Sequence, residues 1–267
     1  MLCYVFMLLS AIGSGLLVWG TGIYWLWAIP IFVGMYVVIN PLFFCVLWIS
    51  TIFLPKKDPI EKPLKGVYFM IWLACDWLTT LLRVKIRFEG MEQFPNEPFV
   101  LVSNHLSNFD PIVILAKVKG RKIAFISKKS NFKIPVAGAY VHNAGFLAID
   151  RENAMSALRT LKRAGEMMNK ESMIMGIYPE GTRSKSGELL EFKEGAFLLA
   201  KRANAPVVVI TTEGTNQIAK RMLWKRTNVN LKVREVIDCD TVKSLSMAEL
   251  AAHVRKTVED GLHQSSK

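Results

Sequence analysis

The first 55 residues of this 267-residue chain contain no charged side chain, and the first charge is Lys56. One straight helix over that stretch would be roughly 80 Å long, whereas the hydrocarbon core of a bilayer is about 30 Å thick. The chain must therefore turn back at least once, and Thr21-Gly22 and Asn40-Pro41 are two candidate break points. We predict two apolar helices, over residues 3–20 and 31–53, that form a membrane hairpin.

Aromatic and basic residues around these two runs indicate how the hairpin would lie in a membrane. Tyr24, Trp25 and Trp27 stand between the runs, and such rings favour the membrane interface. By the positive-inside rule, Lys56 and Lys57 place the rest of the chain on the cytoplasmic face of the cell membrane. A cleavable signal peptide is disfavoured, because the apolar stretch is too long and has no basic start. A shallow hairpin within one leaflet is the alternative.

We expect residues 1–55 to form the hairpin and residues 56–267 to form a second domain. The second part carries all 34 Lys and Arg and all 22 Asp and Glu, so the formal net charge is +12. Nucleic acid or anionic lipid head groups suit such a surface. On a membrane-anchored domain lipid is the simpler partner, and no nucleic acid is expected. A basic cluster that fits either partner consists of Lys117, Lys119, Arg121, Lys122, Lys128, Lys129 and Lys133.

The four cysteines show no spacing typical of a metal site or a disulfide.

Strand-like and helix-like segments alternate along the second domain. Short runs rich in β-branched and aromatic residues predict strands, and apolar residues three or four apart predict helices. This alternation predicts an α/β fold with a central, mostly parallel or mixed sheet flanked by helices. The expected strands cover residues 84–88, 99–103, 123–127, 145–149, 173–178, 206–211 and 229–237, and the expected helices 67–82, 111–117, 153–168, 194–203 and 246–262.

One segment places a histidine and an aspartate directly after a predicted buried strand. His105 follows the strand end, and Asp110 precedes Pro111, where it would act as the N-cap of a helix. A carboxylate can fix the tautomer of an imidazole and raise its basicity, so the pair is a candidate general base with its orienting partner. A substrate hydroxyl would then be the nucleophile. The pattern alone is weak, and turn and helix capping by both residues is the alternative.

A second group of polar residues follows the predicted strand over residues 173–178. Gly181 gives this turn backbone freedom and exposed N–H groups, and Arg183 offers a planar cation suited to phosphate. Glu180 would hold Arg183 or bind a substrate hydroxyl, and Arg151 could share a doubly charged anion. Each residue singly is more typical of a surface salt bridge. Together with the histidine, the aspartate and the membrane hairpin, they indicate a phosphate-bearing lipid with a free hydroxyl.

These motifs resemble those of the membrane-bound glycerolipid acyltransferase family, and the chain looks most like its bacterial 1-acylglycerol-3-phosphate acyltransferases. Asn104-His105-Leu-Ser-Asn-Phe-Asp110 is similar to the family's Asn-His-x4-Asp block, and Tyr178-Pro-Glu-Gly-Thr-Arg183 to its Phe-Pro-Glu-Gly-Thr-Arg block. The segment from Gly145 to Arg151 resembles Gly-x-x-Phe-x-x-Arg, although Ala148 stands where the family prefers Phe. Lys128 resembles a lysine that helps to bind the acceptor phosphate.

The resemblance implies an O-acyltransferase of phospholipid biosynthesis. It would transfer an acyl group from acyl-coenzyme A or acyl carrier protein to the sn-2 hydroxyl of 1-acylglycerol 3-phosphate, giving phosphatidate. No metal or other cofactor is expected. Alternatives are the same chemistry on glycerol 3-phosphate or another lysophospholipid, a hydrolase, or a non-catalytic lipid-binding module. The resemblance assigns catalysis to His105 and Asp110, and contacts to the acceptor phosphate and glycerol to Glu180, Gly181, Thr182, Arg183, Arg151 and Lys128.

Overall fold

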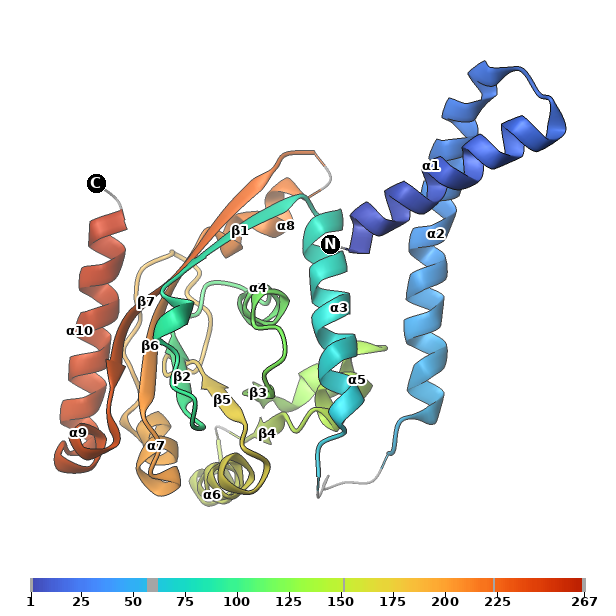
Figure 1. The fold of residues 1–267 in the computed structure, drawn as a ribbon. Coiled ribbons are helices and arrows are strands. Elements are labelled where there is room, and N and C mark those ends of the chain that lie inside the picture. The colour runs from blue at the N-terminus through green and yellow to red at the C-terminus, as the bar shows by residue number, and fades with distance from the viewer. Residues whose placement is uncertain (1, 57–61, 151, 223, 266–267) are drawn as a thin grey trace. The chain divides into compact units, whose positions relative to one another are not determined.

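The computed structural model describes residues 2–56, 62–150, 152–222 and 224–265. The chain divides into two compact units, Met1–Lys56 and Lys57–Lys267. Figure 1 labels the helices and strands of both units along the chain.

The first unit is a helical hairpin. Helix α1 (Leu2–Thr21) ends at the predicted break, and a 3₁₀ turn η1 (Trp25–Trp27) leads into α2 (Ala28–Ser50) and η2 (Thr51–Phe53). The two helices pack against each other, and the ring centroids of Phe6 and Phe43 lie 5.7 Å apart. The predicted turn after residue 20 is therefore present.

Helix α2 continues through Asn40-Pro41, the second candidate break point, as the prediction of one helix over residues 31–53 requires. Pro41 lies inside the helix, although proline removes one backbone donor. The side-chain amide of Asn40 donates to the carbonyl oxygen of Tyr36 at 2.7 Å, which adds a hydrogen bond in the turn before the proline. Apolar helices tolerate proline where such side-chain bonds support the backbone.

Large apolar side chains cover the outside of this hairpin. Trp19 is 85% exposed and Phe53 is 81% exposed. Helix α1 and the segment Trp25–Phe53 are each long and apolar enough to cross a membrane, by length and composition. Because an apolar surface of this extent is costly in water, the two helices favour association with a membrane.

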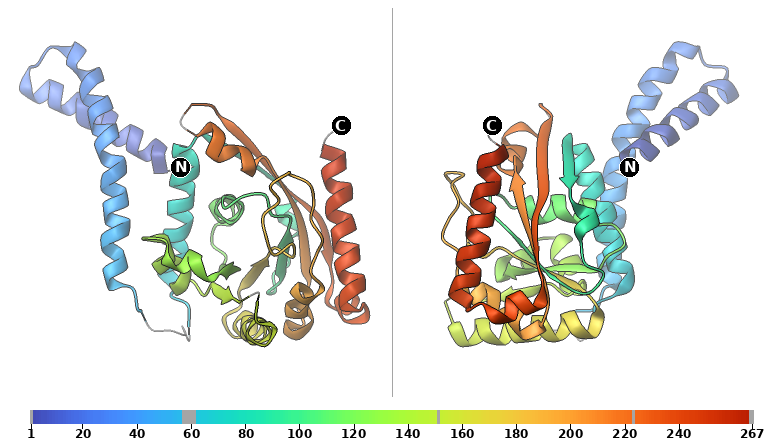
Figure 2. Two further views of the ribbon diagram at one scale, coloured as in Figure 1. Left: turned by 180° about the vertical axis from the view of Figure 1, so that it is seen from behind. Right: turned by 60° about the vertical axis from the view of Figure 1, so that its left-hand side comes forward.

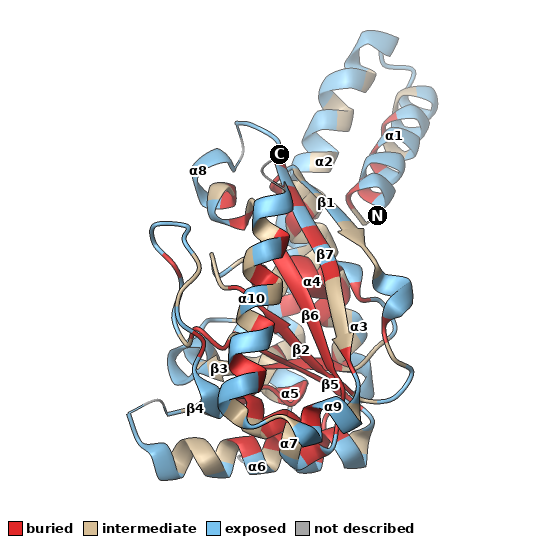
Figure 3. Cartoon of the chain, turned by 90° about the vertical axis from the view of Figure 1, so that its left-hand side faces the viewer, coloured by how far each residue is buried: buried red, intermediate tan, exposed pale blue. Residues whose placement is uncertain are grey.

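The second unit is built on a seven-stranded mixed sheet with the order β1-β7-β6-β2-β5-β3-β4. The strands from β6 to β4 run parallel, whereas β7 is antiparallel to β6 and parallel to β1. Every residue of β2 and β5 is buried, as expected for parallel strands covered on both faces, and Figure 3 shows this buried centre in red. The strands are β1 (Val84–Glu89), β2 (Val100–Ser103), β3 (Ile123–Lys128), β4 (Leu147–Ile149), β5 (Ile174–Ile177), β6 (Val207–Glu213) and β7 (Thr227–Ile237).

Helices cover both faces of this sheet (Figures 1 and 2). Helix α10 packs on β6 and β7, while α3 and α4 pack together and contact β1 from the opposite side. Helix α6 packs on α7 and on β4 and β5. The helices are α3 (Lys65–Leu81), α4 (Asp110–Lys117), α5 (Ala137–Asn143), α6 (Ala154–Glu171), α7 (Leu198–Ala203), α8 (Ile218–Arg221), α9 (Cys239–Ser244) and α10 (Met247–Ser265), with 3₁₀ turns η3 (Met91–Gln93), η4 (Lys129–Lys133), η5 (Glu194–Phe197) and η6 (Thr215–Gln217).

The predicted α/β fold with a mostly parallel, mixed sheet is confirmed, and each predicted strand has a counterpart. The segment 194–203 was expected to be one helix, but it forms η5 followed by α7. Helices α5, α8 and α9 were not predicted, because their 7, 4 and 6 residues are too few to show a helical period. The packing around such short helices decides whether they form.

Part of the predicted basic cluster makes contacts within the second unit. The ammonium group of Lys122 donates to the carbonyl oxygen of Glu171 at 2.6 Å, and the guanidinium of Arg121 donates to that of Pro95 at 2.7 Å. The ammonium group of Lys119 lies 4.5 Å from the ring centroid of Trp72 on α3. These three cations therefore stabilise the fold.

Candidate active site

The predicted polar residues gather because several parallel strands end at the same edge of the sheet. His105 follows β2, the turn of Glu180 follows β5, and Thr215 follows β6. Strands β5 and β6 are the two neighbours of β2. Carboxyl ends of neighbouring parallel strands lie side by side, and this is the edge at which open α/β sheets place their ligands.

Asn104 joins the end of β2 to β6. Its side-chain amide donates to the carbonyl oxygen of Thr212 at 2.9 Å, and its side-chain oxygen accepts from the backbone N–H of Thr212 at 2.8 Å. Both residues are buried. The amide side chain thus acts like one more peptide unit of the sheet and sets the position of the next residue, His105.

His105 and Asp110 form a direct pair. The Nδ1 atom of His105 lies 2.7 Å from Oδ2 of Asp110, and the same oxygen accepts the backbone N–H groups of Leu106 and Ser107 at 2.7 and 2.9 Å. The side chain of Asp110 is 0% exposed, and that of His105 is 15% exposed. The carboxylate is therefore buried, while one part of the imidazole reaches the surface.

The prediction that Asp110 is the N-cap of a helix is wrong. Asp110 is the first residue of α4, and Phe109 occupies the cap position. The carboxylate points back to the turn that precedes the helix, where it accepts two N–H groups and contacts the imidazole. The side chain of Asp110 thus orients His105 and does not cap the helix.

Thr215 completes the surroundings of Asp110, and the sequence reasoning missed it. Its hydroxyl donates to Oδ1 of Asp110, and both residues are 0% exposed. Thr215 follows Gly214 at the end of β6. A glycine after a buried apolar strand is a turn signal that could have drawn attention to this position.

Glu180 ties the β2 and β5 turns together. Its Oε1 atom accepts the backbone N–H of His105 at 2.6 Å, and Oε2 accepts that of Leu190 at 3.2 Å. The carbonyl oxygen of His105 in turn accepts the N–H of Ser184 at 2.9 Å. Glu180 is 3% exposed, and burial raises the pKa of its carboxyl above 4.5, although both N–H bonds oppose the rise. Of the two roles considered for Glu180, the ion pair with Arg183 is not formed, although the structure describes both residues.

Tyr178 packs against the imidazole. The ring centroids of His105 and Tyr178 lie 4.2 Å apart with planes 15° from parallel, and Phe125 stacks on Tyr178 at 5.7 Å. The Tyr178 hydroxyl is buried and finds no hydrogen-bond partner in the described part of the chain. Burial raises the pKa of this hydroxyl well above its usual value, so the group stays protonated.

The predicted phosphate-binding residues lie around this centre with different exposure. Thr182 and Arg183 are exposed in the turn after β5, and Gly181 there has a φ of +70°. Lys128 is exposed at the end of β3, the strand that neighbours β5. Arg151 lies outside the described residues. The structure thus places Thr182, Arg183 and Lys128 at the ends of adjacent strands.

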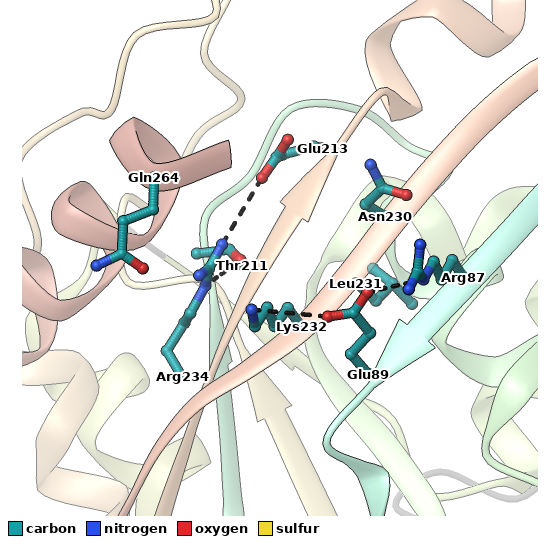
Figure 4. Close-up of a pocket in the computed structure, with 9 residues that line it drawn as sticks. All are labelled: Arg87, Glu89, Thr211, Glu213, Asn230, Leu231, Lys232, Arg234 and Gln264. Carbon is teal, nitrogen blue, oxygen red and sulfur yellow. Dashed lines mark hydrogen bonds and ion pairs between the residues drawn. The ribbon is translucent and has the colours of Figure 1, made fainter. Parts of the chain in front are cut away.

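A polar groove lies elsewhere, on the α10 side of β1, β7 and β6 (Figure 4). Its volume is about 270 Å³, and no residue of the His105 cluster lines it. Its cations face carboxylates: Arg87 and Lys232 lie 2.7 and 3.6 Å from Glu89, and Arg234 lies 3.9 Å from Glu213. The charges of this groove are therefore largely neutralised within the fold.

Fold and site together define an α/β protein with a partly buried histidine–carboxylate pair and cationic side chains at one sheet edge. Residues 85–213 match the family model described as Acyltransferase. The resemblance to the acyltransferases is thereby confirmed for this part of the chain.

Named relatives agree with this family. The chain is 36% identical over 163 residues to the chloroplastic 1-acyl-sn-glycerol-3-phosphate acyltransferase of Arabidopsis thaliana, covering 60% of this chain and 44% of the relative. It is 28% identical over 160 residues to the Haemophilus influenzae enzyme of the same name, covering 60% of this chain and 66% of the relative. The chain thus spans less than two thirds of the length of these relatives.

A crystal structure of the 1-acyl-sn-glycerophosphate acyltransferase PlsC from Thermotoga maritima has a similar fold. The TM-score is 0.65 at 28% sequence identity, over 84% of this chain and 89% of that chain. The likeness therefore extends well beyond the residues that match the family model.

Proposed function

We propose that this chain transfers an acyl group from a thioester to the sn-2 hydroxyl of 1-acylglycerol 3-phosphate and releases phosphatidate. The 2.7 Å contact between Nδ1 of His105 and Oδ2 of Asp110 carries this proposal. That oxygen also accepts two backbone N–H groups, and an ionised carboxylate only accepts. The Nδ1 atom then holds the proton, and Nε2 keeps a lone pair for the substrate hydroxyl.

The reaction follows from this tautomer. Nε2 of His105 takes the hydroxyl proton as the oxygen attacks the thioester carbonyl carbon. The carbon–sulfur bond then breaks, and the sulfur leaves as a free thiol after receiving the proton from the imidazole. General base catalysis contributes about 10²- to 10⁴-fold to a rate. This chemistry uses no metal and no cofactor besides the acyl-coenzyme A or acyl carrier protein that donates the acyl group.

Substrate contacts are proposed from the cations around the pair. Arg183 and Lys128, at the ends of adjacent strands, would bind the acceptor phosphate with Gly181 and Thr182, and the resemblance adds Arg151 to this set. Glu180 would help to position the acceptor glycerol indirectly. Its two oxygens accept the N–H groups of His105 and Leu190 and thereby hold the turn in place.

The location of the reaction is proposed from the hairpin. Helices α1 and α2 would anchor the chain among membrane lipids, where both the acceptor and the product reside. The first charges follow the hairpin at Lys56, which by the positive-inside rule places the catalytic domain on the cytoplasmic face.

The test uses the full chain in detergent with 1-acylglycerol 3-phosphate and a long-chain acyl-coenzyme A. Free thiol and phosphatidate should appear in equal amounts and vanish in His105→Ala. His253→Ala is the matched control, because His253 also contacts a carboxylate, Glu235 at 2.9 Å, but on the exposed surface. Its turnover should stay near that of the unchanged chain.

Other outcomes would refute the proposal in distinct ways. Thiol released together with free fatty acid would indicate a hydrolase. Turnover with glycerol 3-phosphate or another lysophospholipid alone would change the acceptor. Lipid binding without turnover, on both donors and all acceptors, would indicate a binding module.

A further inference from the structure

The segment that joins β6 to β7 carries a group of exposed basic and apolar side chains. Trp224 is 84% exposed, and Met222, two positions earlier, is exposed as well. The sequence has no acidic residue between positions 214 and 234, so nothing within the segment balances its positive charge. We call this group the basic–aromatic tip, and its described members are Lys220, Arg221, Met222, Trp224, Lys225 and Arg226.

A neighbouring part of the fold adds further positive charge to the tip. The four cations of the tip form no ion pair with any residue that the structure describes. The backbone N–H of Thr227 donates to the carbonyl oxygen of Arg83 at 3.2 Å, which places the turn before β1 beside the tip. Lys85 follows on β1, where it lies opposite Asn228. Arg83 and Lys85 are both exposed, so two segments far apart in sequence build one positively charged surface.

The tip lies at the edge of the sheet that carries the candidate active site. His105 follows β2, and Thr215, whose hydroxyl donates to Asp110, follows the neighbouring strand β6. The tip comes next along the chain and precedes β7, which returns antiparallel to β6. The far end of β7 is about 34 Å away, because this strand has 11 residues. The tip therefore belongs to the His105 edge and not to the opposite one.

An exposed tryptophan among cations suits the surface of an anionic membrane. An indole ring buries its apolar body among lipid head groups and keeps its N–H in a polar layer. Each lysine or arginine near an anionic bilayer strengthens binding about fivefold. Single-stranded nucleic acid also binds basic and aromatic side chains. A bilayer is favoured here, because the two apolar helices of the first unit are long enough to cross one.

We propose that the basic–aromatic tip docks on anionic membrane lipid, with Trp224 among the head groups and the cations on the lipid phosphates. The second unit makes this contact by itself, in addition to the anchor that the hairpin supplies. The inference goes beyond the proposed reaction and does not depend on it. Docking would turn the His105 edge of the sheet toward the lipid surface, because the tip lies on that edge.

The test measures insertion of Trp224 in the full chain, reconstituted into vesicles whose phospholipids carry bromine near the head-group end of their acyl chains. Bromine quenches the fluorescence of nearby tryptophans. The chain has seven tryptophans, so the emission of the unchanged chain minus that of Trp224→Phe isolates Trp224. This difference should be quenched in vesicles of equal parts phosphatidylcholine and phosphatidylglycerol. In vesicles of phosphatidylcholine alone the quenching should be at least about twofold weaker.

Charge variants test the role of the cations, with the same subtraction repeated in each. Lys225→Gln/Arg226→Gln should weaken docking of the tip by about tenfold or more and reduce the quenching of Trp224 accordingly. The matched control is Arg202→Gln/Lys243→Gln, which removes the same two charges from exposed positions on α7 and α9. These helices precede β6 and follow β7, so they lie at the opposite edge of the sheet. The control should leave the quenching unchanged.

Three results would overturn the inference. Trp224 that is quenched in neither kind of vesicle does not reach the bilayer. Equal quenching with and without phosphatidylglycerol would exclude recognition of anionic lipid. A lower affinity of Lys225→Gln/Arg226→Gln for a single-stranded oligonucleotide, with lipid quenching unchanged, would assign the tip to nucleic acid. Failure of the proposed reaction would look different, since quenching of Trp224 in a chain that transfers no acyl group would leave the membrane contact standing.

Discussion

The imidazole of His105 and the phenol ring of Tyr178 stack 4.2 Å apart and 15° from parallel. The β5 turn thereby contacts the imidazole face, while Asp110 contacts its edge at Nδ1. Ring packing and a carboxylate together hold the imidazole in one orientation. Positioning of this kind is a large part of what an enzyme contributes to a rate.

Tyr178→Phe should keep this stack and remove only a hydroxyl that has no partner in the described residues. A buried polar group without a hydrogen bond costs about 1–3 kcal/mol, so the variant should be as stable as the unchanged chain or more stable. Thermal unfolding in detergent measures this. Tyr178→Ala, which loses the ring, should instead lower both stability and kcat. A large loss of kcat in Tyr178→Phe would show that the hydroxyl takes part in the reaction.

Asp110→Asn should lower kcat by about 10²- to 10⁴-fold, because an amide in place of the carboxylate no longer fixes the tautomer of His105. His105 and Asp110 act as a unit, so His105→Ala combined with Asp110→Asn should be hardly slower than His105→Ala alone. Steady-state rates of phosphatidate formation check both statements. Multiplicative losses in the double variant would mean that Asp110 acts independently of the imidazole.

Thr215→Val should leave Oδ1 of Asp110 without its hydroxyl donor inside a fully buried site. The expected cost is about 1–3 kcal/mol in the free energy of unfolding, together with a lower kcat from a displaced carboxylate. Thr215→Ser retains the hydroxyl and should restore most of both. Urea unfolding and turnover are measured side by side. Equal behaviour of the two variants would contradict a role for the hydrogen bond.

Glu180 should make stability fall with rising pH. Burial raises the pKa of its carboxyl above 4.5, so the folded chain binds this proton more tightly than the unfolded chain. The contribution of Glu180 to the free energy of unfolding is therefore largest below pH 4.5 and declines as pH rises through the raised pKa. The difference in the free energy of unfolding between the unchanged chain and Glu180→Gln should shrink as pH rises from 4.5 through the raised pKa. Denaturant unfolding of both at several pH values tests this, and a difference that grows with pH would contradict it.

If the positive-inside rule holds for this chain, the second unit should be shielded from the outside of intact cells. A cysteine at Lys256, on the exposed face of α10, should react with a membrane-impermeant thiol reagent only after the cells are permeabilised. The unchanged chain is the control for its own four cysteines. Labelling of Lys256→Cys in intact cells would place the domain on the other face.

The fold was readable from the sequence where one local pattern dominated. The long uncharged start required a hairpin, and the strand-like runs at residues 99–103 and 206–211 correspond to β2 and β6 because buried parallel strands are apolar along their whole length. Asn40-Pro41 remained a second candidate break point, because the hydrogen bond from Asn40 to Tyr36 that supports α2 there leaves no sequence signal. Short helices such as α5 depend on their neighbours and were missed for the same kind of reason.

The sequence by itself determined which residue types stand at the strand ends, including His105 and Asp110, because turn and strand signals are local along the chain. Only the tertiary structure decided how they are used. Asp110 turns toward His105 instead of capping its own helix, and Thr215, far away in sequence, donates to its second oxygen. Glu180 holds the backbone of His105 rather than the side chain of Arg183. These contacts depend on the order in which the strands lie side by side, which is a property of the whole sheet and not of any segment.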